Sequence, residues 1–162
     1  MGHAARFGHA VAKAMMAAGN DLPTEGAVLI TVNDLDKSGA IRIARDLDRL
    51  GFKLYGTRRT VEAIDRGGIP IEQVEKAGSP GTTTVDLIAS GGVQLVINTP
   101  LGQKAHADQQ AMYAAAIAHR VPLITTLSAA RAAVGGIQAL RQRALRVRPL
   151  QEHHQRKKEA RQ

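Results

Sequence analysis

Residues 27–56 read AVLITVNDLDKSGAIRIARDLDRLGFKLYG, and this stretch decides the fold. Its apolar run over 27–32 has the length and composition of a buried strand. Apolar residues then recur at the spacing of one helix face, at Ile41, Ala44 and Leu47. Gly51 is typical of a helix end, and a second apolar run over 52–55 follows it. The stretch therefore predicts a strand–helix–strand unit, which joins two parallel strands.

The same alternation continues toward the carboxyl terminus. The sequence predicts helices over 60–66, 84–89 and 106–119, strands over 73–75, 93–98 and 123–125, a last helix from a Ser128 cap to about Ala144, and an extended edge over 145–150. Strands alternating with helices indicate a parallel sheet covered on both faces. We expect an α/β chain with a three-layer, Rossmann-like fold and a parallel sheet of about five strands.

An amphipathic helix over 4–18 precedes this alternation and ends at Gly19. The domain organisation that we expect is a linker helix over 1–25, the α/β domain over 26–151, and a basic, disordered tail over 152–162. The last 22 residues contribute +6 of the net charge of +8, so the rest of the chain is close to neutral. Because no aromatic residues interleave with those basic ones, the tail does not predict nucleic-acid binding.

Composition excludes several classes of protein. The 162 residues contain no cysteine, which excludes disulfides and thiol chemistry. The apolar runs are far shorter than the ~20 residues that a membrane span needs, and the first residues do not read as a signal peptide. We therefore expect a cytoplasmic protein without membrane contact. The six histidines show no recognisable metal-ligand spacing, so no metal site is predicted.

Polar residues follow the predicted strands, at the edge of a parallel sheet where ligands bind. Lys37 falls in the first turn of a helix, where the helix dipole disfavours a cation unless an anion is near. Hydroxyls, arginines and helix amides meet at Gly56–Thr60, and two further polar stretches follow at Lys76–Thr84 and Asn98–Gly102. Thr60 alone could equally be a helix cap. Together the four stretches favour one shared anion site.

The ordered set of motifs resembles the methylglyoxal-synthase-like (MGS-like) domains, most closely the carboxy-terminal allosteric domain of the carbamoyl-phosphate synthase large subunit. The motifs are Phe7–Ala10, Ala18–Asn20, Asp36-Lys37, Gly51-Phe52, Gly56-Thr57 with Thr60, Asn98–Pro100 and Thr125–Leu127. The resemblance implies a nucleotide effector, UMP or IMP, held by its phosphate. It implies the contacts Lys37, Thr57, Thr60, Lys76, Asn98 and Thr99, with Thr125 as a second effector contact. Pro100 and Leu123 depart from the pattern of some relatives.

The resemblance also implies the setting of the domain. Its partners would be the remainder of the synthetase large subunit and the glutaminase small subunit, and a homo-oligomer stays open. No cofactor is expected in this domain, because ATP and magnesium are used elsewhere in the parent ligase. The domain would have no catalytic residues of its own and would serve pyrimidine and arginine biosynthesis by regulation.

The enzyme branch of the same family, methylglyoxal synthase, is the alternative. Its reaction on dihydroxyacetone phosphate needs a carboxylate that abstracts a carbon-bound proton. The loop that supplies this acid in the enzyme branch reads Gly81-Thr82-Thr83-Thr84 here, and the next acid, Asp86, is expected on a helix. His106 does resemble a histidine of the enzyme branch. A site that keeps its phosphate contacts without this acid favours regulation over catalysis.

Overall fold

The computed structural model describes residues 7–100 and 107–142 of the chain. Its centre is a sheet of five parallel strands in the order β3-β2-β1-β4-β5, so the sheet reverses its winding direction beside β1. The strands are β1 (Ala27–Val32), β2 (Lys53–Gly56), β3 (Glu72–Gln73), β4 (Leu95–Thr99) and β5 (Leu123–Ile124). The expected α/β fold with a parallel sheet of about five strands is confirmed.

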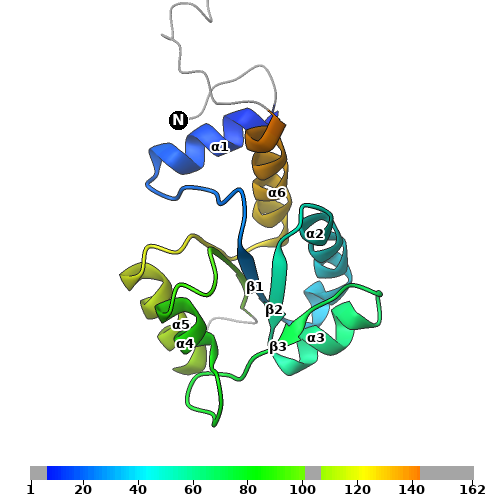
Figure 1. The fold of residues 1–162 in the computed structure, drawn as a ribbon, viewed down its shortest axis with the longest axis vertical. Helices are drawn as coiled ribbons and strands as arrows, with labels where there is room; N and C mark the ends of the chain where they lie inside the picture. Colours follow the sequence, from blue (N-terminus) through cyan, green and yellow to red (C-terminus); the bar gives the residue numbers. More distant parts are fainter. Residues whose placement is uncertain (1–6, 101–106, 143–162) are drawn as a thin grey trace, which may run out of the picture.

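Helices connect the strands and cover both faces of the sheet (Figure 1). They are α1 (Phe7–Ala17), the 3-10 turn η1 (Asp34–Asp36), α2 (Lys37–Arg49), α3 (Arg58–Asp65), α4 (Thr84–Ala89), α5 (Ala107–Ala118) and α6 (Leu127–Gln142). Helices α2, α3 and α6 lie on one side of the sheet, and α4 and α5 lie on the other (Figure 1). This is the three-layer arrangement that the alternation of strands and helices predicts.

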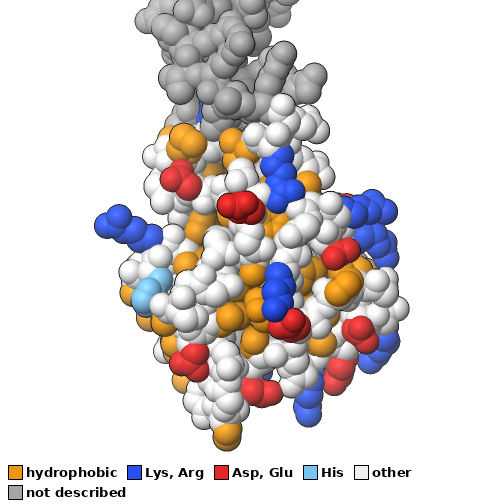
Figure 2. All heavy atoms as spheres, viewed as in Figure 1, with side chains coloured by type: hydrophobic (Ala, Val, Ile, Leu, Met, Phe, Trp, Pro, Cys, Tyr) orange, Lys and Arg blue, Asp and Glu red, His pale blue; other side chains and the backbone are white. Residues whose placement is uncertain are grey.

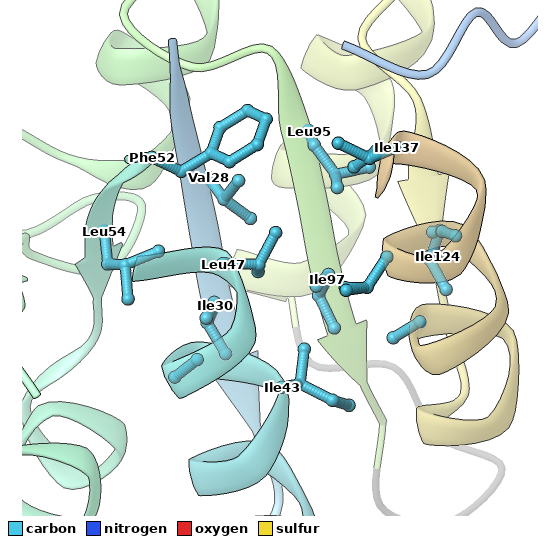
Figure 3. Packing of buried hydrophobic residues seen from close by; sticks show 14 of the residues in the cluster. Val28, Ile30, Ile43, Leu47, Phe52, Leu54, Leu95, Ile97, Ile124 and Ile137 are labelled. Atoms are coloured by element: carbon cyan, nitrogen blue, oxygen red, sulfur yellow. The ribbon is translucent and has the colours of Figure 1, made fainter. Parts of the chain in front are cut away.

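Alternate residues of β1 supply the two cores, because successive side chains of a strand point to opposite faces. Val28 and Ile30 belong to the larger core, which includes residues of α2, α3 and α6. Figure 3 shows these side chains converging between the sheet and helices α2 and α6. Ala27 and Leu29 belong to the smaller core against α4 and α5. A strand buried on both faces explains why residues 27–32 are almost continuously apolar.

Helix α1 packs against α6 through small residues. Gly8 lies so close to α6 that a Cβ atom there would run into the backbone carbonyl of Gly135, whereas a Cβ at Gly135 would meet nothing within 4 Å. Ala12 is also buried in this contact and belongs to the larger core. The first helix is therefore docked on the last helix, but not through the apolar face that the spacing of Phe7, Ala14 and Ala18 predicts, because these three residues are exposed.

An arginine fixes the segment between α1 and β1. The Arg141 guanidinium on α6 donates hydrogen bonds to the backbone carbonyls of Thr24, at 2.6 Å, and Leu50. It also lies over the ring of Phe52, 5.1 Å from the centroid. Because Thr24 precedes β1, while Leu50 and Phe52 precede β2, this contact sits at the amino ends of the two strands.

Two local expectations differ from the structure. The Ser128 cap is wrong, because α6 begins at Leu127 and the Thr126 hydroxyl accepts the Ala129 amide at 3.2 Å. The strand expected over 73–75 is β3 at Glu72–Gln73, which pairs with only two residues of β2. The edge over 145–150 and the tail over 152–162 lie outside the described residues, and the domain boundaries remain predictions. Among the described helices, none is long and apolar enough to cross a membrane.

Candidate functional site

A cavity of about 530 Å³ lies at the carboxyl ends of the central strands. This is the edge of a parallel sheet, beside the change of winding direction, where ligands of such folds bind. Its walls come from the ends of β1, β3 and β4, the segment after β3, and the starts of α3, α4 and α5. They are Thr31–Asp34, Thr57–Thr60, Gln73–Lys76, Ser79, Thr84, Asn98, Thr99, Asp108, Gln109 and Met112.

The amino terminus of α3 opens into this cavity. Thr57 occupies the position before the helix, yet its side chain makes no hydrogen bond to the helix amides. The first amides of a helix have no partner within the helix and carry a partial positive charge, so they attract anions. Arg58 and Arg59, the first two helical residues, line the cavity as well. The start of α3 therefore offers amide, hydroxyl and guanidinium donors to one anion.

Thr60 ties α3 to β1. Its side chain is buried, and its Oγ1 atom accepts a hydrogen bond from the Val32 amide at 3.2 Å. Because Thr60 is the third residue of α3, it is not the helix cap that was the alternative interpretation. A hydroxyl that accepts one hydrogen bond still has its own proton to donate. Thr60 can therefore hold an anion and position the helix at the same time.

The turn η1 is fixed to β4 by Asn33. The Asn33 side chain accepts the amides of Leu35 and Asp36, at 2.9 and 3.1 Å. Its Nδ2 atom donates to Asp36 at 2.8 Å and to Thr99 Oγ1 at 3.2 Å. The Asn33 amide donates to the same threonine oxygen at 3.3 Å. The buried Thr99 thus serves first to hold the turn after β1 against the end of β4.

Lys37 points to a carboxylate of the chain itself. Its Nζ atom lies 2.8 Å from Asp34, and Arg59 lies 2.6 Å from the other carboxylate oxygen of Asp34. The hydrogen bond from Lys37, followed by the charges of Arg59 and Lys37, lowers the pKa of Asp34. Asp34 lines the cavity and Lys37 does not. The dipole argument for Lys37 therefore needs correction, because Asp34 already supplies a neighbouring negative charge.

Helix α5 contributes Asp108 to the cavity wall and contacts another wall residue, Asn98, through Tyr113. Asn98 is buried and donates from Nδ2 to the hydroxyl of Tyr113 at 2.7 Å. Lys76 lies 3.4 Å from Asp108 at the start of α5. Asp108 and Tyr113 were missed by sequence reasoning, and only their place in the predicted 106–119 helix could have drawn attention to them.

The structure brings most of the sequence-predicted contacts together. Thr57, Thr60, Lys76, Asn98 and Thr99 all line the cavity. Lys37 reaches it only through Asp34, and Thr125 is exposed after β5 and is not part of the wall. Asn33, Asp34 and Gln73 also line the cavity, although none was a predicted contact. The spacing of Asp34 and Lys37, three residues apart, was the available signal for their ion pair.

The acidic side chains in and near the cavity differ in whether they face it. Glu75 and Asp108 line it, whereas Asp86 forms a capping box at the start of α4. Asp86 accepts hydrogen bonds from the Thr83 hydroxyl at 2.7 Å and, with a smaller effect, from the Thr83 amide at 3.0 Å, and both lower the pKa of Asp86. His106 lies outside the described residues. In the described ranges, no group of three His, Cys, Asp or Glu side chains could hold a metal ion.

Charges of both signs share the surface around this fold. On the face drawn in Figure 2, basic and acidic side chains lie interspersed over the described residues. The hydrogen-bond donors that line the cavity come from the ends of a few strands and the starts of a few helices. The arrangement is suited to binding a small anion with additional polar groups.

Comparison with known proteins identifies similar chains. The MGS-like domain family model matches residues 39–125. The chain is 43% identical over 154 residues to the carbamoyl phosphate synthase large chain of Acidobacterium capsulatum, covering 95% of this chain and 14% of that one. It is 43% identical over 155 residues to the carbamoyl phosphate synthase large chain, C-terminal section, of Methanopyrus kandleri, covering 95% and 29%.

A third relative, the carbamoyl phosphate synthase large chain of Gemmatimonas aurantiaca, is 44% identical over 149 residues, covering 92% of this chain and 14% of that one. The chain thus spans only a small part of the length of the curated relatives it matches. The family match covers more than half of the chain and includes most of α2, all of α3 and the ends of β3 and β4 at the cavity, whereas the end of β1 precedes the matched range. The chain belongs to the family of MGS-like domains.

Proposed function

We propose that this chain is the regulatory domain of a glutamine-dependent carbamoyl-phosphate synthase large subunit, and that its cavity binds a nucleoside monophosphate such as UMP or IMP. The relatives that span nearly the whole chain are named as large chains of that synthase. The observation that carries the ligand class is the open amino terminus of α3, where the Thr57 side chain caps none of the first three amides and only the third, that of Thr60, bonds to the Thr57 carbonyl. Such a terminus is a ready site for a phosphate.

The size of the cavity favours a nucleotide over a bare phosphate. Ligand pockets of about 300–1,000 Å³ are typical for small organic ligands, and this one measures about 530 Å³. Beyond the start of α3, the walls carry amides and hydroxyls at Gln73, Ser79, Asn98 and Gln109. These groups can exchange hydrogen bonds with a ribose or a base.

In this proposal the domain regulates a reaction that occurs elsewhere. The remainder of the large subunit makes carbamoyl phosphate with ATP and magnesium, and the glutaminase small subunit supplies ammonia in the cytoplasm. The bound nucleotide changes that activity only if it makes different contacts in two states of the subunit. In this proposal the domain itself contributes no catalytic residue.

Isothermal titration calorimetry of UMP and IMP against the chain tests the proposal. We expect saturable binding of at least one of them. Thr57→Val removes the hydroxyl beside the α3 amides, and it should weaken binding about tenfold to 100-fold, the usual range for a hydrogen bond to a charged group. Thr24→Val, which alters an exposed threonine outside the cavity wall, is the matched control and should bind like wild type. Absence of saturable binding by the folded chain would overturn the proposal.

Methylglyoxal synthesis is the second candidate, because Glu75 and Asp108 line the same cavity as the phosphate donors. A carboxylate near a bound triose phosphate could abstract the required proton. We expect no methylglyoxal from dihydroxyacetone phosphate, since Asp86 is engaged in its capping box and Asp108 lies beside Lys76. Product formation that is lost in Asp108→Asn or on substitution of His106 would favour the enzyme and contradict the regulatory proposal.

A further inference from the structure

One carboxylate holds two cations from different elements. Asp34, in the turn η1, lies 2.8 Å from Lys37 Nζ through one oxygen and 2.6 Å from Arg59 through the other. Lys37 begins α2, and Arg59 is the second residue of α3. The Asp34 carboxylate therefore bridges the turn after β1 to the helix after β2, across the edge of the sheet where the cavity lies.

The Asp34 carboxylate lies beside the cations of the proposed phosphate site and carries a negative charge, as a ligand phosphate would. Asp34 and Arg59 line the cavity, whereas Lys37 is separated from it by Asp34. The Lys37 ammonium group directs one of its three N–H donors at Asp34, and a ligand phosphate would compete with Asp34 for that donor. A negative group of the chain thus satisfies the same donors that a ligand phosphate would use.

We propose that Asp34 is an internal counter-anion, which a phosphate monoester displaces from Arg59 and Lys37 when it binds in the cavity. The inference rests on the proposed function for its ligand, but it concerns a residue that opposes binding. After the exchange, the phosphate accepts from Arg59 and Lys37, and the Asp34 carboxylate turns to solvent.

The exchange is favourable for a dianion in particular. The Asp34 side chain is 52% exposed and that of Arg59 is 69% exposed, so their ion pair is of the weak, solvent-screened kind. Asp34 carries one negative charge, whereas a phosphate monoester carries close to two above its second pKa near 6. Asp34 therefore competes effectively with singly charged carboxylates and poorly with phosphate dianions, which makes it a selectivity residue.

The backbone of the turn does not depend on Asp34. Asn33 holds the turn through the amides of Leu35 and Asp36, and it is bonded to Thr99 on β4. Rotation of the Asp34 side chain breaks neither set of hydrogen bonds. Substitution of Asp34 is therefore compatible with the folded state, and it releases the link between η1 and α3.

Asp34→Asn tests the inference, with Asp36→Asn as the matched control. Both variants remove one negative charge from η1, but Asp36 bonds to Asn33 and has no ion pair with Lys37 or Arg59 in the described residues. Calorimetry at pH 7.5 and about 0.15 M salt should show that Asp34→Asn binds inorganic phosphate and UMP about threefold to tenfold more tightly than wild type. Asp36→Asn should change either affinity by less than about twofold, because within the described residues Asp36 makes no ion pair with Lys37 or Arg59 and does not line the cavity.

The outcomes separate this inference from the proposed function. Unchanged or weaker phosphate binding by Asp34→Asn, or an equal gain in Asp36→Asn, overturns the counter-anion even if wild type binds UMP through Thr57. Tighter binding of inorganic phosphate by Asp34→Asn without any binding of UMP or IMP supports the counter-anion and rejects the nucleotide. If no phosphate compound binds to wild type or to Asp34→Asn, both proposals fall.

A second readout follows the carboxylate itself. The charged groups around Asp34 are Lys37 on α2 and Arg59 on α3, and they hold its pKa below the ordinary value. Titration of the Asp34 side chain by NMR should show this pKa rising when the chain is saturated with inorganic phosphate. A pKa that stays low in the saturated protein would mean that the ion pairs persist, and it would overturn the displacement.

Discussion

Arg141 and Arg59 lie at opposite ends of the same parallel strands and bind different partners. Arg141, at the amino ends, donates to the backbone carbonyls of Thr24 and Leu50 and covers the ring of Phe52. Arg59, at the carboxyl ends, binds the side chain of Asp34 beside the cavity. Backbone carbonyls cannot leave without unfolding, whereas a carboxylate side chain can rotate away. The first arginine is therefore structural, and the second is available for exchange.

The same contrast separates the two regions as a whole. At the amino ends, α1 packs on α6 through Gly8 and Gly135, and Arg141 of α6 donates to the carbonyl of Thr24 in the linker before β1. At the carboxyl ends, Lys37, Arg59 and Lys76 each meet a carboxylate of the chain. We infer that substitutions at the amino ends change folding stability, and that substitutions at the carboxyl ends change ligand affinity. Each substitution below could contradict this division, which assigns stability to the amino ends and ligand affinity to the carboxyl ends.

Gly8→Ala should have the largest effect on stability. Its Cβ atom would collide with the carbonyl of Gly135, and overpacking of this kind costs about 1–3 kcal/mol. Urea denaturation followed by circular dichroism measures the loss. Gly135→Ala is the control, because its Cβ atom meets nothing within 4 Å and alanine favours a helix by about 1 kcal/mol. Both replacements gain the helix preference of alanine, so a Gly8→Ala variant as stable as Gly135→Ala would mean that α1 is not docked on α6.

Arg141→Ala and Arg59→Ala test the division directly. Loss of the two carbonyl contacts of Arg141 should lower the free energy of unfolding by about 1–2 kcal/mol. Loss of the exposed Arg59 pair should change it by less than about 0.5 kcal/mol. Thermal unfolding of the two variants beside wild type is sufficient to compare them. A larger loss in Arg59→Ala would reverse the assignment of the two arginines.

Thr83→Ala tests the carboxylate of Asp86, which hydrogen bonds hold in the cap of α4, in contrast to that of Asp34. Removal of the Thr83 hydroxyl breaks the capping box of α4 and should cost about 1 kcal/mol at pH 7. Hydrogen bonds from Thr83 lower the pKa of Asp86, so they stabilise its charged form. Their contribution is therefore present above the ordinary pKa of an aspartate and is lost as the pH falls through the lowered value.

The difference in unfolding free energy between wild type and Thr83→Ala should consequently shrink on acidification toward pH 2. Urea unfolding at pH 7, 4 and 2 measures it. A difference that grows toward low pH would contradict the role of the charged Asp86 in the cap.

The layout of the fold could be predicted because it depends on local patterns. The apolar run at 27–32 and the helix at 84–89 have the expected bounds in the structure. The helix expected over 60–66 begins earlier, at Arg58, because Thr57 rather than Thr60 occupies the position before it. Ser128 failed as a cap for a related reason, since the hydroxyl of Thr126 was equally suitable by type and better placed.

The site was predictable in its place but not in its pairings. Strand ends of a parallel sheet meet at one edge, so Thr57, Thr60, Asn98 and Thr99 could be grouped without a structure. The partner of Arg59 is 25 residues away in Asp34, and that of Asn98 is Tyr113 on another element. Such contacts depend on side-chain directions across the fold, which spacing along the chain does not determine.

The hydrogen bond between Asn98 and Tyr113 links the cavity wall to a fluorescent side chain. The chain contains no tryptophan and two tyrosines, so its intrinsic fluorescence comes from Tyr55 and Tyr113 alone. The Tyr113 hydroxyl is bonded to Asn98, a residue of the cavity wall, and phenol emission depends on such bonding. Occupancy of the cavity can therefore be followed by tyrosine emission without a label, with Tyr55→Phe leaving a signal from the reporting ring only.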